Sequence, residues 1–418
     1  MVYREILFRE LVRLPSTTYA TNGLYMYPAK FIPHVVRYAI EKYTSPGDWV
    51  FDPFAGYGTV AIEASLTGRN TVLWDLNPMT EVFTLASIFK GYLSLKDFEL
   101  DWDYGSPFHP SWENIYYWHP REFYVILSRL WGYWHREVYG KAGSGLEVQR
   151  AYAIAIPLLK VTRFFSYSDE KIAKLYKSKR AVEKVSRLLS TDWRSMMVRM
   201  YWDEARRVVE KIREYNALHP KQVEIVLKTS RKHKGRLIVF DSLTERLDRD
   251  VKLLITSPPY LQAQEYIRSF KLELAWLGYS GKDLRELSSH EIPYNKPGRV
   301  EVRSRTYSEL LEKIKGFGEK LLELYEAYFH SLIRFLNNNA DRVEYIAIFV
   351  GPVKVRNLRV PIDEILREHL EALGFKHVET LIDRIIARRL FKNTINPATG
   401  LMDERTPTEH LLVMKKKG

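Results

Sequence analysis

The stretch Val251-Lys252-Leu253-Leu254-Ile255-Thr256-Ser257-Pro258-Pro259-Tyr260 joins an apolar run to a proline pair. The apolar run is typical of a buried strand. Because neither proline has a backbone N–H to donate, the strand ends where the pair begins and the chain leaves the sheet in a stiff turn. That turn presents the Ser257 hydroxyl and the Tyr260 ring at the carboxyl end of the strand, where open α/β sheets bind their ligands. We therefore expect a functional site here.

A glycine-rich loop follows an earlier strand signal, Trp49-Val50-Phe51-Asp52, and reads Pro53-Phe54-Ala55-Gly56-Tyr57-Gly58-Thr59. Its glycines let the backbone approach a ligand closely, which a dinucleotide-binding protein would also require. A carboxylate at Asp52, however, would repel a pyrophosphate and attract a cationic amino acid moiety. Asp75 ends the next strand signal, where it can accept hydrogen bonds from ribose hydroxyls. S-adenosylmethionine, which carries an ammonium and a sulfonium, fits both carboxylates.

Helical and strand patterns alternate around these loops and predict an α/β fold with a doubly wound sheet. Helical patterns lie at 28–45, 59–67, 307–337 and 361–373, and strand patterns at 49–52, 71–75, 223–227, 237–241, 251–256, 345–350, near 378–387 and at 410–414. The intervening segment is aromatic-rich and helix-like. We therefore expect one catalytic domain built from 20–79 and 223–418, interrupted by a mainly helical insertion over 80–222.

These two loops together resemble the exocyclic-amino DNA methyltransferases, and the Ser-Pro-Pro-Tyr form is similar to members that act on N4 of cytosine. The resemblance implies a Rossmann-like S-adenosylmethionine-dependent methyltransferase fold with a mostly parallel seven-stranded sheet. Tyr27-Pro28-Ala29-Lys30-Phe31 is similar to the segment that closes over the methionine end of the cofactor, and Asp241 to the acidic residue that accepts from its adenine amino group. The cofactor-binding residues implied are Tyr27, Lys30, Phe31, Asp52, Phe54, Gly56, Gly58, Thr59, Asp75 and Asp241.

The chain departs from the family pattern in one respect. Its large insertion lies before Asp241, rather than just before the strand that carries the catalytic turn. The insertion over 80–222 is a candidate DNA target-recognition region, but the resemblance does not identify the segment that reads the DNA sequence.

The resemblance also implies catalytic roles for Ser257, Pro258, Pro259 and Tyr260. The lone pair of an exocyclic amine is delocalised into its ring, so a site helps by accepting hydrogen bonds from that amine as positive charge develops. We expect the Ser257 hydroxyl and the Pro258 carbonyl to accept them, Pro259 to fix the turn and Tyr260 to stack on a flipped-out base. The chain contains no cysteine, which excludes a C5-cytosine methyltransferase because that class needs a thiolate nucleophile.

The formal net charge of +13 fits either a polyanionic partner or a solvated basic surface. Double-stranded DNA is the partner that the resemblance implies. The candidate DNA-binding residues are Arg163, Lys174, Lys177, Lys179, Arg180, Arg231, Lys232, Arg268 and Arg303, and the basic loop 289–305 is a further DNA-facing candidate. The bland alternatives for these residues are a solvated helix face and a charged hairpin tip.

Other features narrow the setting of the protein. No histidine pair has metal-ligand spacing beside a carboxylate, so we expect no metal site. No apolar stretch approaches the length of a membrane span, and the first residues lack the apolar core of a signal peptide. We therefore expect a cytoplasmic protein without a membrane partner.

The leading hypothesis is a site-specific DNA methyltransferase that modifies N4 of cytosine, with a cognate restriction endonuclease as a further partner. Methylation of N6 of adenine poses the same chemical problem and stays open. A base-amine RNA methyltransferase is another alternative, although Ser257 and the lack of a recognisable RNA-binding module favour DNA. A DNA-binding protein on a degenerate scaffold is the non-enzymatic alternative.

Overall fold

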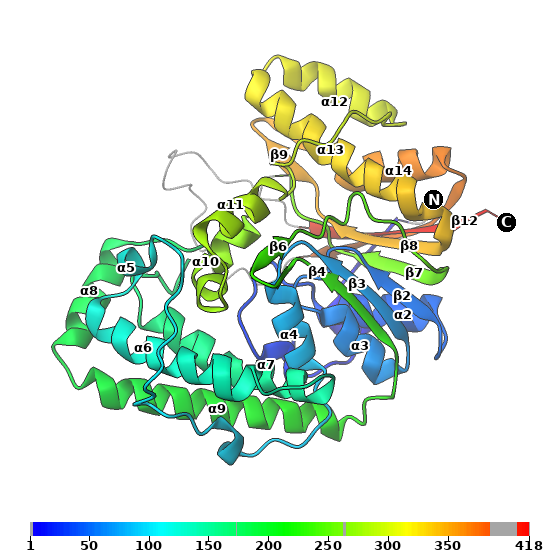
Figure 1. Ribbon diagram of the computed structural model, residues 1–418. Helices are drawn as coiled ribbons and strands as arrows, with labels where there is room; N and C mark the ends of the chain where they lie inside the picture. The colour runs from blue at the N-terminus through cyan, green and yellow to red at the C-terminus, as the bar shows by residue number, and fades with distance from the viewer. Residues whose placement is uncertain (1–2, 173, 262–264, 385–407, 418) are drawn as a thin grey trace.

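The computed structural model describes residues 3–172, 174–261, 265–384 and 408–417. Its central sheet has eight strands in the order β1-β11-β12-β8-β7-β2-β3-β4 (Figure 1). All neighbouring strands are parallel except β12, which is antiparallel to both β8 and β11. The strands are β1 (Tyr3–Ile6), β2 (Trp49–Asp52), β3 (Asn70–Asp75), β4 (Ile225–Thr229), β7 (Val251–Thr256), β8 (Val343–Val350), β11 (Phe375–Arg384) and β12 (Thr408–Lys416).

Two short hairpins stand apart from this sheet. They pair β5 (Arg231–His233) with β6 (Arg236–Ile238) and β9 (Val353–Val355) with β10 (Leu358–Val360).

Helices cover both faces of the sheet, as the alternation of side chains along each strand requires. On β7, Leu253 and Ile255 pack with α2, α3 and α4 in one apolar core, whereas Leu254 packs with α13 and α14 in a second core on the opposite face (Figure 1). The helices outside the insertion are α1 (Phe8–Leu11), α2 (Pro33–Tyr43), α3 (Thr59–Thr67), α4 (Met79–Ser87), α10 (Tyr266–Trp276), α11 (Gly281–Ser289), α12 (Arg305–Lys315), α13 (Glu319–Asn339) and α14 (Ile362–Ala372), with short 3-10 turns at Ala20–Gly23 and Ala340–Arg342.

The chain between β3 and β4 forms a helical layer beside the sheet (Figure 1). After α4 it contains a 3-10 turn (Leu95–Phe98), α5 (Ile115–Trp118), α6 (Arg121–Tyr133), a π-helical turn (Trp134–Tyr139), α7 (Leu146–Phe164), α8 (Lys179–Leu189) and α9 (Trp193–Ala217). Apolar residues of α6, α7 and α9 join the same core as those of α2 and α3. A separate insertion domain over 80–222 stays a prediction.

The predicted Rossmann-like fold is confirmed, and several elements differ in detail; the helix predicted over 28–45, for example, spans only Pro33–Tyr43. An eighth strand, β1, was not predicted and pairs in parallel with β11 at the edge of the sheet. The strand predicted over 237–241 is only the three-residue β6 of a hairpin, because the Phe240 amide turns to the Ser230 hydroxyl at 2.9 Å. The helix predicted over 307–337 is broken into α12 and α13 at Gly318, whose φ of 111° is not helical.

The strand predicted near 378–387 begins earlier, at Phe375, and its last three predicted positions lie outside the described residues. Among the described residues, no helix is long and apolar enough to cross a membrane.

Candidate active site

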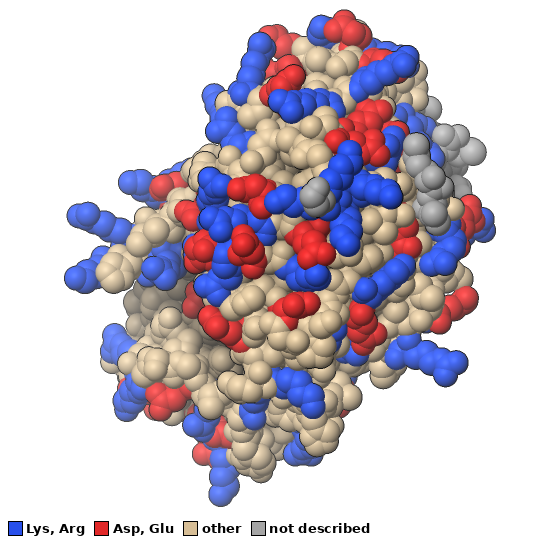
Figure 2. Space-filling model, turned by 90° about the vertical axis from the view of Figure 1, so that its right-hand side faces the viewer, with Lys and Arg blue, Asp and Glu red and all other residues tan. Residues whose placement is uncertain are grey.

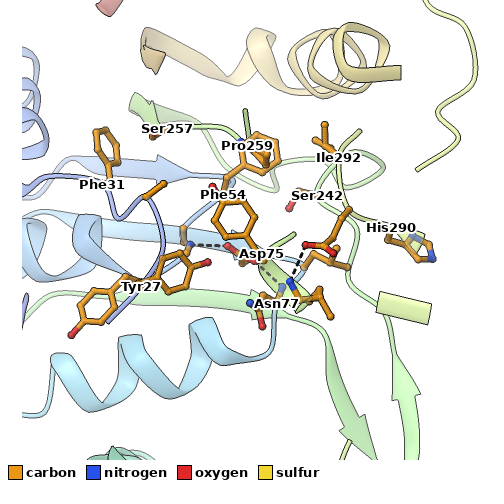
Figure 3. A pocket seen from close by; sticks show the side chains of 18 of the residues that line it. Tyr27, Phe31, Phe54, Asp75, Asn77, Ser242, Ser257, Pro259, His290 and Ile292 are labelled. Atoms are coloured by element: carbon orange, nitrogen blue, oxygen red, sulfur yellow. Dashed lines mark hydrogen bonds between the residues drawn. The ribbon is translucent and has the colours of Figure 1, made fainter. Parts of the chain in front are cut away.

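A pocket opens at the carboxyl ends of β2, β3 and β7 and contains about 810 Å³ of space, part of it open solvent. Its walls come from the loops that follow these three strands and from residues within 27–31, 241–243, 266–267 and 290–292 (Figure 3). Sites for small ligands have volumes of this order and occur at this edge of an α/β sheet. The pocket therefore lies at the edge of the sheet where the sequence predicts both loops.

The turn after β7 contributes Ser257 and Pro259 to the pocket wall (Figure 3). Pro258 is buried and points to the other side, into an apolar recess with Leu332 and Phe335 of α13. This packing fixes the turn while Ser257 faces the pocket. The next residue, Tyr260, donates a hydrogen bond from its hydroxyl to Glu409 Oε1 of β12 at 2.5 Å.

The loop after β2 is tied to the end of β3 by Asp75. Asp75 Oδ2 accepts from the Gly56 amide and Oδ1 from the Asn77 amide, each at 2.7 Å (Figure 3). Burial raises the pKa of Asp75 to about 6, so the carboxyl group is ionised at neutral pH. A carboxylate has about four acceptor positions, so two backbone bonds leave room for the hydroxyls of a ligand.

Gly56 is required where it stands for two reasons. Its φ of 52° lies in the left-handed region, and a Cβ there would lie 3.2 Å from the Tyr27 ring. Tyr27 in turn stacks against Tyr266, with ring centroids 6.0 Å apart. Phe31 and Phe54 also line the pocket (Figure 3). Aromatic rings thus face the Asp75 carboxylate across the same space.

Asp52 lies beside the pocket, with only 1% of its surface exposed. Its Oδ1 accepts from Thr256 Oγ1 at 2.7 Å and from the Phe54 amide at 3.2 Å. Burial, with a smaller contribution from the nearby Asp75 carboxylate, raises the pKa of Asp52 to about 7. Asp52, the last residue of β2, is therefore hydrogen-bonded to Thr256, the last residue of β7, and β7 carries the catalytic turn. Attraction of a cationic ligand by Asp52 stays a prediction.

The three remaining cofactor-binding candidates lie behind the pocket wall. Gly58 precedes α3 with a φ of 87° and packs against Thr84, which leaves no space for a Cβ. Thr59, the first residue of α3, is buried. The Lys30 ammonium donates to the Thr17 carbonyl at 3.2 Å and to the Asn22 carbonyl, and burial lowers the pKa of Lys30 to about 8. In this structure these residues shape the loops rather than line the pocket.

Several pocket residues were not among the predicted site residues. Asn77 lies two positions after the predicted Asp75 and Ser242 directly follows the predicted Asp241, so their place in those loops could have indicated them. His290, Glu291 and Ile292 follow α11 in the loop 289–305, which was predicted to face DNA rather than the cofactor, and they reach the pocket through the fold. Burial raises the pKa of Glu291 to about 7, although its Oε1 accepts from the Ile267 amide at 2.9 Å. His290 Nδ1 lies 3.8 Å from Asp241 Oδ2.

Among the basic residues predicted to contact DNA, Arg163 does not face solvent. It lies on α7, where its guanidinium donates to Glu273 Oε1 and to the Ser269 carbonyl of α10, both at 2.8 Å. Only 12% of its side chain is exposed, and none of that of Glu273. The expected DNA contact of Arg163 is therefore replaced by a buried ion pair between two helices, which a sequence pattern of alternating charges does not reveal.

Other predicted DNA contacts are partly engaged within the protein. Lys174 and Arg268 share Glu265 Oε2, at 3.1 and 2.9 Å. The Lys232 ammonium lies 3.1 Å from Asp283 Oδ2. The other engaged side chains are those of Lys177, between the rings of Tyr117 and Tyr167, Arg180, paired with Asp169, and Arg303, paired with Glu301 at 3.0 Å.

Lys179 and Arg231 are exposed. On the face shown in Figure 2, lysine and arginine are interspersed with acidic side chains rather than gathered in one basic patch. Within the described residues, no group of three or more histidine, aspartate and glutamate side chains could hold a metal ion.

Comparison with known proteins identifies a matching family model and several sequence relatives. Residues 10–82 match the family model described as "DNA methylase", N6_N4_Mtase, a stretch that contains Tyr27, the glycine-rich loop and Asp75. The chain is 25% identical over 316 residues to the type II methyltransferase M.BsoBI of Geobacillus stearothermophilus, covering 71% of this chain and 61% of that protein. It is 44% identical over 57 residues to the type II methyltransferase M.XycI of Xanthomonas campestris pv. cyanopsidis, covering 14% and 18%.

The chain thus spans less than two thirds of the length of these relatives. A solved structure, the rRNA methyltransferase aviRa of Streptomyces viridochromogenes, aligns with 11% identity and a TM-score of 0.32 over 98% of this chain and 96% of that one. A superposition this loose says nothing about the substrate. The predicted relationship to the exocyclic-amino DNA methyltransferases is confirmed by the family model and the sequence relatives, and with it S-adenosylmethionine as the cofactor that the family implies.

Proposed function

The chain is related to the exocyclic-amino DNA methyltransferases, and from this premise we propose that it methylates N4 of a flipped-out cytosine in duplex DNA with S-adenosylmethionine as the donor. The observation that carries the proposal is that Ser257, from one distant part of the chain, lines the same pocket as Gly56 and Asp75 (Figure 3). A methyl donor held by the latter two residues would lie in one cavity with the catalytic turn.

The pocket residues fit S-adenosylmethionine in their chemistry. The Asp75 carboxylate keeps free acceptor positions for ribose hydroxyls, and Phe54, Leu76 and Ile292 supply apolar surface for an adenine ring. Asp241 Oδ1 accepts from the Leu243 amide at 2.9 Å, which orients this carboxylate at the pocket edge to accept from an amino group. When bound, S-adenosylmethionine supplies an electrophilic methyl group on a sulfonium.

The protein residues would act on the amine of the target base. The Ser257 hydroxyl faces the pocket and can accept a hydrogen bond from the amine, which favours the positive charge that develops on nitrogen during transfer. We keep the Pro258 carbonyl as the second acceptor, Pro259 as the residue that holds the turn, and Tyr260 as the stacking partner of the base. Its hydroxyl bond to Glu409 would hold that ring in place.

Mapping of the methylated nucleoside tests this proposal. The purified protein is incubated with unmodified duplex DNA and S-adenosylmethionine, and the digested nucleosides are separated and weighed by mass spectrometry. N4-methylcytosine supports the proposal, whereas N6-methyladenine supports the alternative amine. Structured RNA is the competing substrate, and methylation of RNA but not of DNA would contradict the choice of DNA. A cognate restriction endonuclease is the partner we propose, and it would cleave the same site when unmethylated.

A further inference from the structure

A second hollow adjoins the cofactor pocket and shares Asp241, Leu243 and His290 with it. It contains about 850 Å³ of space, part of it open solvent, between the loop after α11 and the side of α13. Its other charged lining residues are Lys296 and Arg334. Asp241 is the single acidic residue among the described lining residues, and its Oδ1 is already engaged by the Leu243 amide. The hollow is therefore basic on the side away from the cofactor pocket.

Arg334 is the most informative residue of this hollow. Its Nε atom is buried, yet nothing in the described chain accepts a hydrogen bond from it. No described carboxylate forms an ion pair with its guanidinium, in contrast to Arg342 on the same polypeptide, which pairs with Asp250 at 3.2 Å. A buried donor of a charged group without an acceptor has lost its hydrogen bond to water and gained none in return, which is unfavourable. Such a group is explained most simply by an acceptor that arrives with a ligand.

The loop over Arg334 leaves space for the guanidinium because a glycine, Gly298, lies beside it. A Cβ at Gly298 would lie 2.6 Å from Arg334 Nη2, so a larger residue there would displace the arginine. Lys296 and Arg299, on the same loop, are exposed and have no ion pair within the described part of the chain. Burial lowers the pKa of His330, one turn before Arg334 on α13, and the charges of Arg299 and Arg334 lower it further against the opposing charge of a nearby glutamate. Two of these three charges near His330 are therefore positive.

We propose that this hollow binds a phosphate group, with the Arg334 guanidinium and the Lys296 ammonium as its donors. Guanidinium groups match phosphate oxygens with two parallel hydrogen bonds, and a lysine adds a point charge. Because the hollow adjoins the proposed cofactor pocket and shares three lining residues with it, a backbone phosphate of the DNA substrate is the favoured source, and this part of the inference rests on the proposed function. A free phosphate or nucleotide is the other source of the same chemistry.

The test compares the salt dependence of duplex binding among variants. Fluorescence anisotropy with a labelled duplex is measured over a series of salt concentrations for the full chain, Arg334→Gln, Lys296→Gln and the control Arg342→Gln. Loss of one phosphate contact lowers the magnitude of the slope of log K against log salt by about 0.9. We expect this change for Arg334→Gln and Lys296→Gln and none for Arg342→Gln. A calorimetric titration with inorganic phosphate, with sodium chloride as the reference salt, runs in parallel.

The possible outcomes distinguish a DNA phosphate from a free phosphate, and they distinguish failure of this inference from failure of the proposed function. An unchanged DNA slope with loss of inorganic phosphate binding assigns the site to a free phosphate. Unchanged DNA binding and unchanged phosphate binding in folded Arg334→Gln and Lys296→Gln overturn the inference. Because Lys296 is exposed, its variant stays informative even where Arg334→Gln does not fold. None of these measurements requires methyl transfer, so a changed slope without any methylated nucleoside would sustain this site and contradict the proposed function.

Discussion

The pocket edge of the sheet and the helical layer between β3 and β4 use charge in opposite ways. At the pocket edge, the buried Asp52 and the half-buried Asp75 accept from backbone amides and one hydroxyl, and no basic side chain of the described residues pairs with them. In the helical layer, buried or half-buried cations are matched by acids, as in Arg163 with Glu273 at 2.8 Å and Lys160 with Glu204 at 2.7 Å. Carboxylates that lack a basic partner among the described residues therefore lie at the pocket edge, where we propose that a ligand binds.

The net charge of a chain is therefore a weaker guide to its partner than the way in which its individual charges are paired. The basic segment around α7 and α8 looked like a DNA surface in the sequence, yet much of it pairs internally. Arg334, which no motif indicated, has no such partner in the described chain. The following substitutions test whether charges are paired in the helical layer and unpaired at the pocket edge.

The largest expected effect concerns Arg163. We expect Arg163→Gln to lower the free energy of unfolding by about 3–5 kcal/mol, because it leaves the buried Glu273 carboxylate without its partner. Urea denaturation measures this change, with the exposed Arg187→Gln as a control that stays within about 0.5 kcal/mol. A stable Arg163→Gln protein that has lost DNA affinity would return Arg163 to the DNA interface and break the comparison.

At the pocket edge, Ser257→Ala tests the catalytic turn. We expect kcat to fall by about 10²–10³-fold, the loss typical when one hydrogen-bonding group to a developing charge is removed. The dissociation constant of S-adenosylmethionine should stay unchanged, because Ser257 is placed against the base rather than the cofactor. Steady-state kinetics and calorimetry check both values, and Ser186→Ala on the exposed side of α8 is the matched control. Weakened cofactor binding with normal kcat would reverse the assignment.

The buried Asp52 predicts an unusual dependence of stability on pH. Its pKa is raised to about 7 in the folded protein, against about 3.9 when unfolded, so the folded state binds the proton more tightly. Ionisation of Asp52 therefore destabilises the fold increasingly as pH rises from about 4 to 7. We expect Asp52→Asn to gain stability relative to the native protein over this window, by a few kcal/mol at most. A stability difference that does not vary between pH 4 and 7 would show that Asp52 is not buried as a titrating acid.

The hydrogen bond between Thr256 and Asp52 predicts a smaller effect. Thr256→Val keeps the shape but removes the donor, and we expect a loss of about 1–3 kcal/mol in the free energy of unfolding because a buried acceptor loses its partner. Thr256→Ser keeps the hydroxyl and should retain most of that stability. Equal stability of the Val and Ser variants would mean that this bond does not join the two strand ends.

The smallest effect is expected at Lys179, an exposed residue at the start of α8. If it contacts one phosphate, Lys179→Gln lowers the magnitude of the salt slope of duplex binding by about 0.9 and leaves the free energy of unfolding within about 0.5 kcal/mol. A salt slope identical to that of the native chain would remove α8 from the proposed DNA surface. The tested cations of the helical layer would then not contact DNA, in contrast to the residues proposed at the pocket edge.

The fold and the cofactor loops could be predicted because they depend on local sequence. An apolar strand, a proline pair and a glycine at positive φ, such as Gly56, specify backbone geometry within a few residues. The side of each turn that faces the pocket could not be predicted, since Pro258 points away only because α13 packs there. His290 and Glu291 come from a loop whose place depends on the whole fold.

A crystal structure of the full chain with S-adenosylhomocysteine decides whether the methyl donor and the turn after β7 share one cavity. We expect ribose hydroxyls within hydrogen-bond distance of Asp75, the adenine beside Asp241, and the sulfur in the same cavity as the Ser257 hydroxyl. A ligand bound elsewhere, or bound at Asp75 with its sulfur facing away from the turn after β7, would contradict this expectation.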